Sequence, residues 1–192
     1  RVTATVRNTG NVSGKEVVQV YASLPGGILE KEAHRLAAYA KTNELKPGEA
    51  QEVTMEVKMD GLTSYDEKRA AWILESGFYG IWVGNSLASA KLCGGIKLDQ
   101  EVIRRQVRNL FPLKQELEEI SQEASKTAKR AAAAAQQAKE EELTVLNIRG
   151  ADIATETVEY KKNADLYEKE AMDFVNTLSE EDLIDLAAGD PG

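Results

Sequence analysis

The chain has 192 residues with 24 basic and 32 acidic side chains, which gives a formal net charge of −8. This balance argues against a nucleic-acid partner, because a nucleic-acid-binding protein needs a basic patch to displace counterions from phosphates. One cysteine, Cys93, excludes an internal disulfide, and one histidine, His34, excludes the common zinc sites of several Cys and His ligands. No apolar run approaches the roughly 20 residues that cross a bilayer, so we expect no membrane partner.

The first hundred residues predict a series of short strands. In RVTATVRN, Val2, Ala4 and Val6 alternate with polar residues, which is the period of a half-buried strand. The segment KEVVQVYAS predicts a second strand with Val18 and Val20 on its core face, and RLAAYAKT predicts a third.

The segment ELKPGEAQEVTMEVKM has the clearest strand pattern. Pro47-Gly48 predicts a tight turn, after which apolar residues such as Val53 and Met55 alternate with polar ones. Further strands are predicted in AAWIL, FYGIWVGNS and ASAKLCGGIKL. Short strands at intervals of roughly 8 to 12 residues, separated by turn signals, predict an all-β sandwich of the immunoglobulin type.

Two tryptophans are candidates for a binding role, because exposed aromatic rings can stack on sugar rings. The alternative is that Trp72 and Trp82 fill the core, since a small sandwich needs large side chains inside. We expect both to be buried, together with Tyr79. We also expect Cys93 to be a small buried side chain.

His34 lies close in sequence to Glu30 and Glu32, which raises the question of a metal site. Two carboxylates and one histidine in a loop are more typical of a solvated surface than of a metal site. We therefore expect no metal and no cofactor.

The second half of the chain has a different composition. From Leu113 to Glu142 it consists mostly of Leu, Glu, Lys, Gln and Ala, with five alanines at 131–135, which predicts a helix of about 30 residues. An alanine stripe packs closely but buries little area. The helix is therefore interpreted as a spacer or as an arm on another domain, with self-association through its exposed face as a further possibility. A coiled coil is disfavoured, because large apolar residues stop after Ile120.

The C-terminal part predicts an extended segment followed by helices. Residues 143–163 look extended, and helical spacing returns at Ala164. The sequence LSEEDL is a helix-start signal: Ser179 can cap the helix while Asp182 returns a carboxylate, and Leu178 can pack on Leu183.

Three ordered segments give the chain a family resemblance. VRNTGNVSGKEVVQVYAS, LAAYAKTNELKPGEAQEVTMEV and LTSYDEKRAAWILESGFYGIWVGNS resemble the fibronectin type III-like domain of glycoside hydrolase family 3. The resemblance covers residues 1 to about 98 and departs from the family pattern at EKEAHRLAAYAKT. It implies that the first strand of the domain is missing.

The tail carries a second resemblance. FVNTLSEEDLIDLAAGDPG is similar to the first helix of the catalytic (β/α)₈ barrel of the same family, which implies the permuted subgroup in which the barrel comes last. The chain then divides into a sandwich at 1–98, a linker with the long helix at 99–142, an extended segment at 143–163 and helices at 164–192. This organisation implies an internal fragment whose partners are the α/β sandwich and barrel of a parent hydrolase.

The resemblance also implies what the chain lacks. A retaining glycosidase needs two carboxyl groups about 5–5.5 Å apart, and the family's S-D-W-like nucleophile motif is absent from this sequence. We expect no catalytic residue, so that the parent would hydrolyse β-glycosidic bonds in its carbohydrate substrate and the fragment would not. Asp190 is the single weak candidate for substrate contact and is interpreted as a turn residue. A carbohydrate-binding or adhesive sandwich is the alternative, and the low cysteine content favours the cytoplasm.

Overall fold

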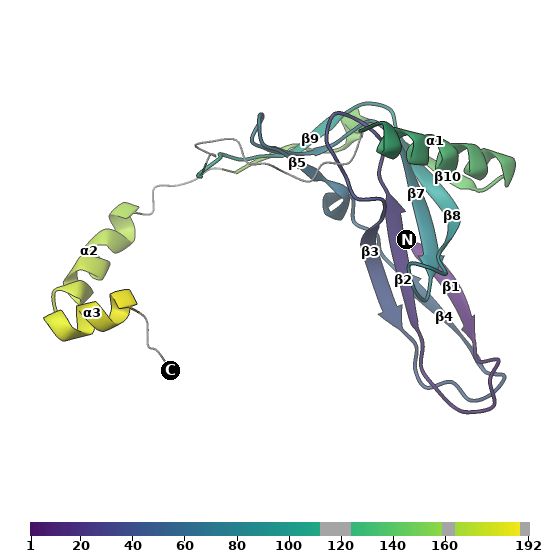
Figure 1. The fold of residues 1–192 in the computed structure, drawn as a ribbon, viewed down its shortest axis with the longest axis horizontal. Coiled ribbons are helices and arrows are strands. Elements are labelled where there is room, and N and C mark those ends of the chain that lie inside the picture. Colours follow the sequence, from purple (N-terminus) through teal and green to yellow (C-terminus); the bar gives the residue numbers. More distant parts are fainter. Residues whose placement is uncertain (112–123, 159–163, 189–192) are drawn as a thin grey trace. The chain divides into compact units, whose positions relative to one another are not determined.

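The computed structural model describes residues 1–111, 124–158 and 164–188. The chain divides into two compact units, Arg1–Val158 and Glu159–Gly192. The first unit is a β-sandwich with a helix on its outer face (Figure 1), and the second is a pair of helices.

The described residues of the first unit form three sheets. β1 and β4 form an antiparallel pair, β10-β8-β7-β2-β3 form a five-stranded sheet, and β11-β9-β6-β5 form a four-stranded sheet. Their bounds are β1 Val2–Arg7, β2 Val17–Ser23, β3 Arg35–Lys41, β4 Ala50–Met55, β5 Ser64–Asp66, β6 Ala71–Leu74, β7 Gly77–Gly84, β8 Lys91–Leu98, β9 Val102–Gln106, β10 Thr144–Ile148 and β11 Glu156–Thr157. Short 3₁₀ turns, η1 and η2, occupy Met59–Leu62 and Gly150–Asp152.

The hydrophobic core lies between the β1–β4 pair and the five-stranded sheet. Val18 and Val20 of β2 and Val53 and Met55 of β4 are buried there, as their alternation predicts. In the predicted turn directly before β4, Gly48 takes a positive φ of 79°, a conformation that favours glycine. The predicted sandwich class is confirmed.

A register shift in β8 explains how this strand contributes side chains both to the sandwich core and to the opposite face of the sheet. Ile81 of β7 is opposite Gly94, but Trp82 is opposite Leu92, so Cys93 is an extra residue in β8. Such a bulge reverses the alternation of a strand. Leu92 therefore faces the outer side of the sheet, whereas Ile96 lies in the sandwich core.

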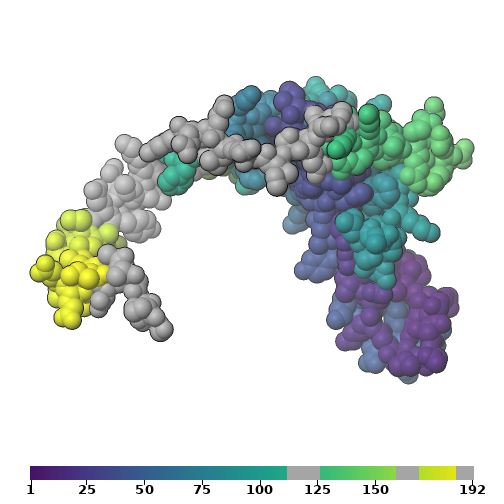
Figure 2. All heavy atoms as spheres, viewed as in Figure 1, coloured from purple at the N-terminus to yellow at the C-terminus, as the bar shows by residue number. Residues whose placement is uncertain are grey.

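Helix α1, Ala124–Glu140, forms a third layer over β7 and β8 (Figure 1). Its buried face consists of Thr127, Ala131, Ala134 and Ala138, which recur at intervals of three or four residues, the spacing of one helix face. Small side chains let the helix approach the sheet closely. The green atoms of α1 and β10 in Figure 2 accordingly form one surface with the teal atoms of β7 and β8.

The structure changes the interpretation of the predicted linker. Its described helical part begins at Ala124, and the predicted start at Leu113 lies outside the described residues. The alanine face packs on the chain's own sandwich, not on another domain, and so is not exposed for self-association. Across the predicted boundary at residue 98, β9 pairs with β6 and β10 pairs with β8, within the compact unit that extends to Val158.

The second unit contains α2, Ala164–Val175, and α3, Glu180–Ala188. The predicted cap of α3 is present: the Asp182 amide donates to Ser179 Oγ at 3.1 Å, and the Ser179 amide donates to Asp182 Oδ2 at 2.9 Å. The Ser179 hydroxyl also donates to Asp182 Oδ2 at 2.6 Å, and this bond, and next the one from the Ser179 amide, hold the pKa of Asp182 below its usual range. Among the described helices, none has the length and apolar character of a membrane span.

Candidate interaction surfaces

A buried tyrosine fixes the corner between β6 and β7. Tyr79 is 1% exposed, and its hydroxyl donates to the carbonyl oxygen of Glu75, four residues earlier, at 2.7 Å. Burial, and next the nearby Glu75 carboxylate, raise the pKa of this hydroxyl, so it keeps its proton and stays a donor. This tyrosine corner is typical of immunoglobulin-like sandwiches, and the prediction that Tyr79 is buried is confirmed.

The Glu75 side chain anchors the loop between β2 and β3. One carboxylate oxygen forms an ion pair with Lys31 Nζ, and the other accepts the Ile28 amide at 2.5 Å. Lys31 Nζ also donates to the carbonyl oxygens of Pro25 and Leu29, each at 3.2 Å. Both charged side chains are buried. Their ion pair and hydrogen bonds therefore stabilise the loop between β2 and β3.

Trp82 lies between the sheet and helix α1. It faces outward from β7, packs with Leu92, Ala134 and Ala138, and is half-buried. The prediction that it fills the sandwich core is therefore wrong: the apolar cluster that it joins is the separate one beneath α1. Its indole nitrogen donates to Ser23 Oγ at 3.0 Å.

Gly80 provides the space for this hydrogen bond. A Cβ atom on Gly80 would lie 2.6 Å from Ser23 Oγ and 3.0 Å from the indole nitrogen of Trp82. The glycine is thus required by the close approach of these two side chains.

His34 packs edge-on against Trp82, with ring centroids 5.0 Å apart. The expectation of a solvated histidine is wrong, because His34 is half-buried, although Glu30 and Glu32 are exposed as expected. Burial, and next the positive charge of Arg130, lower the pKa of His34. Within the described part of the chain, no group of three or more Cys, His, Asp or Glu residues is placed to bind a metal ion.

The sequence YDEKRAAW closes the β5–β6 hairpin through one arginine. Asp66 accepts the amides of Lys68 and Arg69, and the Arg69 guanidinium bridges Asp66 and Glu101. Hydrogen bonding from Arg69 lowers the pKa of both carboxyl groups. These ion pairs link the hairpin to Glu101, the residue before β9. Both carboxylates are bound by Arg69, so they do not form a catalytic pair of a general acid and a general base.

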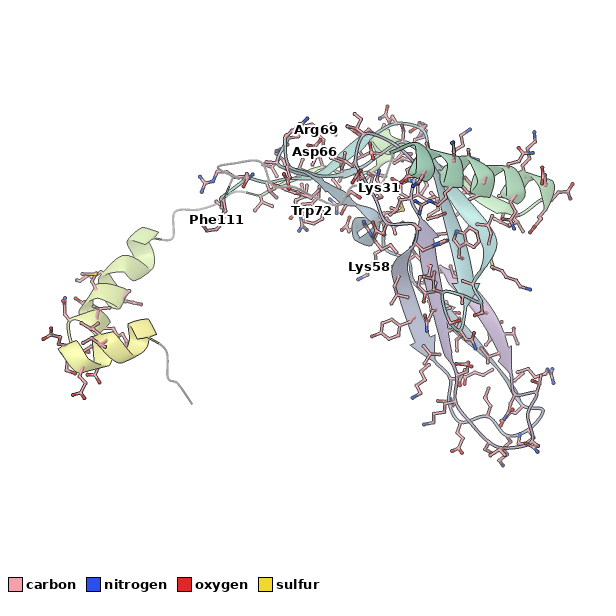
Figure 3. The ribbon with its side chains drawn as sticks, viewed as in Figure 1. Lys31, Lys58, Asp66, Arg69, Trp72 and Phe111 are labelled. Atoms are coloured by element: carbon pink, nitrogen blue, oxygen red, sulfur yellow. The ribbon has the colours of Figure 1, made fainter. Side chains whose placement is uncertain are left out.

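Trp72 is the residue for which the sequence prediction fails most clearly. It is 41% exposed, and in Figure 3 it lies on the opposite side of the β5–β6 strands from Asp66 and Arg69. Alternation carried the correct signal, because Ala71 and Ile73 on either side are buried. Tyr65 on the neighbouring strand stacks at a tilt on Trp72, with ring centroids 5.4 Å apart.

Cys93 and Asp190 were also singled out in the sequence. Cys93 is exposed, so the prediction that it is buried is wrong, and the bulge that it forms in β8 is the cause. Asp190 lies outside the described residues. The charged clusters described above were not predicted, because each includes an ion pair between residues far apart in sequence: Lys31 with Glu75, and Arg69 with Glu101.

Comparisons with known proteins agree with this architecture. The fibronectin type III-like domain family matches residues 16–87. Beta-glucosidase A of Butyrivibrio fibrisolvens is 44% identical over 110 residues, and a beta-glucosidase of Ruminococcus albus is 39% identical over 118 residues. The matches cover 55% and 58% of this chain, but only 13% and 12% of the two relatives.

A solved structure shows the same likeness. The beta-glucosidase from Paenibacillus barengoltzii superposes with a TM-score of 0.52 and 32% identity, over 56% of this chain and 13% of that one. The packed sheets and the tyrosine corner define the class as a fibronectin type III-like β-sandwich. More particularly, residues 16–87 match the fibronectin type III-like domain, and about half of the chain is similar to a part of proteins named beta-glucosidases.

Proposed function

We propose that this chain is a non-catalytic module that braces the catalytic domains of a β-glucosidase-type hydrolase. The observation that carries the proposal is that the buried charged side chains Glu75 and Lys31 have structural partners. They form an ion pair with each other and hydrogen bonds to the loop between β2 and β3. A catalytic carboxyl needs access to substrate, whereas this one is enclosed. The relatives that share the domain are named beta-glucosidases.

The proposed parent follows the permuted order, with an α/β sandwich before this domain and a barrel after it. The capped helix α3 supports this order, because Ser179 and Asp182 form the helix start that resembles the family's first barrel helix. In this arrangement residues 164–192 lead into the barrel, and Asp190 is a turn residue near its sugar-facing end. The parent's partners and its sugar substrate belong to the same proposal.

A hydrolysis assay tests the proposal. The 192-residue chain and the longer protein that contains it are each incubated with an aryl β-glucoside, and release of the aryl group is followed. We expect turnover by the longer protein and none by the chain. Turnover that co-purifies with the chain, and that is lost when its fold is destabilised by Lys31→Met at the buried ion pair, would overturn the non-catalytic assignment. A longer protein without glycosidase activity would overturn the assignment of the parent.

The bracing role needs a separate measurement in the longer protein. Tyr79→Phe weakens the sandwich without touching its surface, because Tyr79 is buried. We expect the variant to inactivate at lower temperature while its KM at 25 °C stays unchanged. An unchanged inactivation temperature would contradict bracing, and Tyr39→Phe, at an exposed position, is the matched control.

A further inference from the structure

The exposed face of the four-stranded sheet places unlike side chains in one row. Tyr65 of β5 is opposite Trp72 of β6, Trp72 is opposite Arg105 of β9, and Arg105 is opposite Glu156 of β11. Directly opposite residues in a sheet have their side chains on the same face. The row therefore runs from two aromatic rings to a guanidinium and a carboxylate.

A bulge in β9 adds a second guanidinium to this face. Trp72 is opposite Arg105, but Ile73 is opposite Ile103, so Arg104 is the extra residue. Bulges redirect a side chain locally. Here Arg104 and Arg105 both line the same hollow beside Trp72.

The hollow has a volume of about 230 Å³ and is lined by Trp72, Arg104, Arg105, Asp60 and Thr63. This is below the roughly 300–1,000 Å³ of pockets for drug-sized ligands, so it suits a single ring. Trp72 offers this hollow an aromatic surface, and the polar lining residues offer hydrogen-bond donors and acceptors. An aromatic ring carries partial negative charge on its face, which attracts the polarised C–H groups of a sugar ring.

Both guanidiniums are held in place by carboxylates of the same chain. Arg104 donates to the Asp60 carboxylate at 2.5 and 3.2 Å and to the Ala154 carbonyl oxygen at 3.1 Å. Arg105 donates to Glu156 at 3.1 Å. Planar groups fixed in this way need little ordering when a ligand binds.

The paired charges discriminate between ligand classes. An anion would have to compete with Asp60 and Glu156 for the guanidiniums, whereas a neutral polyol can accept from the arginines and donate to the carboxylates at once. We propose that the Trp72 hollow is a non-catalytic binding site for one neutral pyranose ring of a β-glucoside or β-glucan chain. The choice of sugar rests on the proposed function, because it takes the parent to act on β-glucosides.

Binding is measured by titrating the 192-residue chain with cellobiose and following the indole N–H resonances of its two tryptophans. The Trp72 resonance is assigned by its absence from Trp72→Phe. We expect a saturable shift of the Trp72 resonance and none of the Trp82 resonance. Trp72→Ala should weaken cellobiose binding, followed by calorimetry, about tenfold or more, which corresponds to about 1.4 kcal/mol.

Two further variants separate the site from general surface effects. Arg104→Gln keeps Trp72 but removes a donor, and should weaken binding severalfold. Tyr39→Ala removes another exposed aromatic ring, on β3, and should leave binding unchanged. Circular dichroism confirms that each variant is folded.

Two results would overturn the proposal. In the first, cellobiose causes no saturable shift of the Trp72 resonance in the folded chain. In the second, the Trp72→Ala variant binds cellobiose as well as the wild-type chain does. Preference for inorganic phosphate over cellobiose would overturn the neutral-sugar assignment. Loss of thermal stability in the longer protein on Trp72→Ala, with no sugar binding by the chain, would assign the face to a domain contact instead. Hydrolysis by the longer protein without binding here would leave the proposed function standing, so the two can fail separately.

Discussion

The Tyr79 hydroxyl lies 2.7 Å from the Glu75 carbonyl oxygen, and the Glu75 side chain forms an ion pair with Lys31. One residue thus joins the β6–β7 corner to the loop that precedes β3. The main-chain group of Glu75 fixes the corner and its carboxylate fixes the loop. Because all three residues are buried, each of these bonds is sheltered from competing water.

Tyr79→Phe should lower the free energy of unfolding by about 1–3 kcal/mol, because it leaves a buried carbonyl oxygen without its donor. Urea unfolding followed by tryptophan fluorescence measures the change, since both tryptophans belong to the first unit. The control Tyr39→Phe alters an exposed ring and should change stability by less than about 0.5 kcal/mol. Equal effects of the two variants would contradict the corner bond.

Lys31→Met should cost more, about 3–5 kcal/mol, because it leaves the Glu75 carboxylate buried without its partner. Adding Glu75→Gln in the same chain removes the uncompensated charge and should restore part of the loss. The two single variants and the double variant form a cycle whose coupling energy is read from urea unfolding. Additive single effects would show that the pair contributes no interaction of its own.

Features that depend on strand alternation and on local turn and cap residues were mostly predicted from the sequence. Val18, Val20, Val53 and Met55 are buried as expected, and the cap of α3 has the expected partners. Such features depend on residues only a few positions apart, so a single sequence reveals them.

What could not be predicted depends on bulges and long-range pairing. The extra residue Cys93 reverses the alternation of β8, and Arg104 does the same in β9. Gly94 and Gly95 follow Cys93 and are a signal for a bulge, whereas Arg104 has no glycine or proline beside it. Trp72 was assigned to the core because of its size, although its buried neighbours Ala71 and Ile73 already placed it on the opposite face.

Helix α1 should leave the sheet when its buried alanine face is charged. Ala134→Glu places a carboxylate against Leu92 and Trp82, whereas Ala133→Glu adds the same residue at an exposed position of the same helix. The two variants have the same helix propensity, so a difference between them reports packing alone. We expect a red-shifted Trp82 fluorescence and faster amide exchange at 126–140 in Ala134→Glu only. Identical spectra would contradict the packing of α1 on β7 and β8.

His34 should make the stability of the first unit depend on pH in a defined window. Burial, and next Arg130, lower the pKa of His34 below its ordinary value of 6.5. The unfolded chain therefore takes up a proton near pH 6.5 that the folded chain does not yet bind. Stability should be highest above pH 6.5, fall as the pH drops toward the folded pKa, and level off below it.

The measurement compares urea unfolding at pH 7.5 and pH 5.5 for the wild-type chain and for His34→Gln. Carboxyl groups with lowered pKa, such as Glu32 and Asp66, titrate below their ordinary values of 4.5 and 3.8, and so contribute little in this window. His34 is the single histidine of the chain. The wild-type chain should therefore lose more stability between the two pH values than His34→Gln does. Equal losses would mean that His34 takes up its proton as readily in the folded chain as in the unfolded one, and that its packing on Trp82 does not exclude charge.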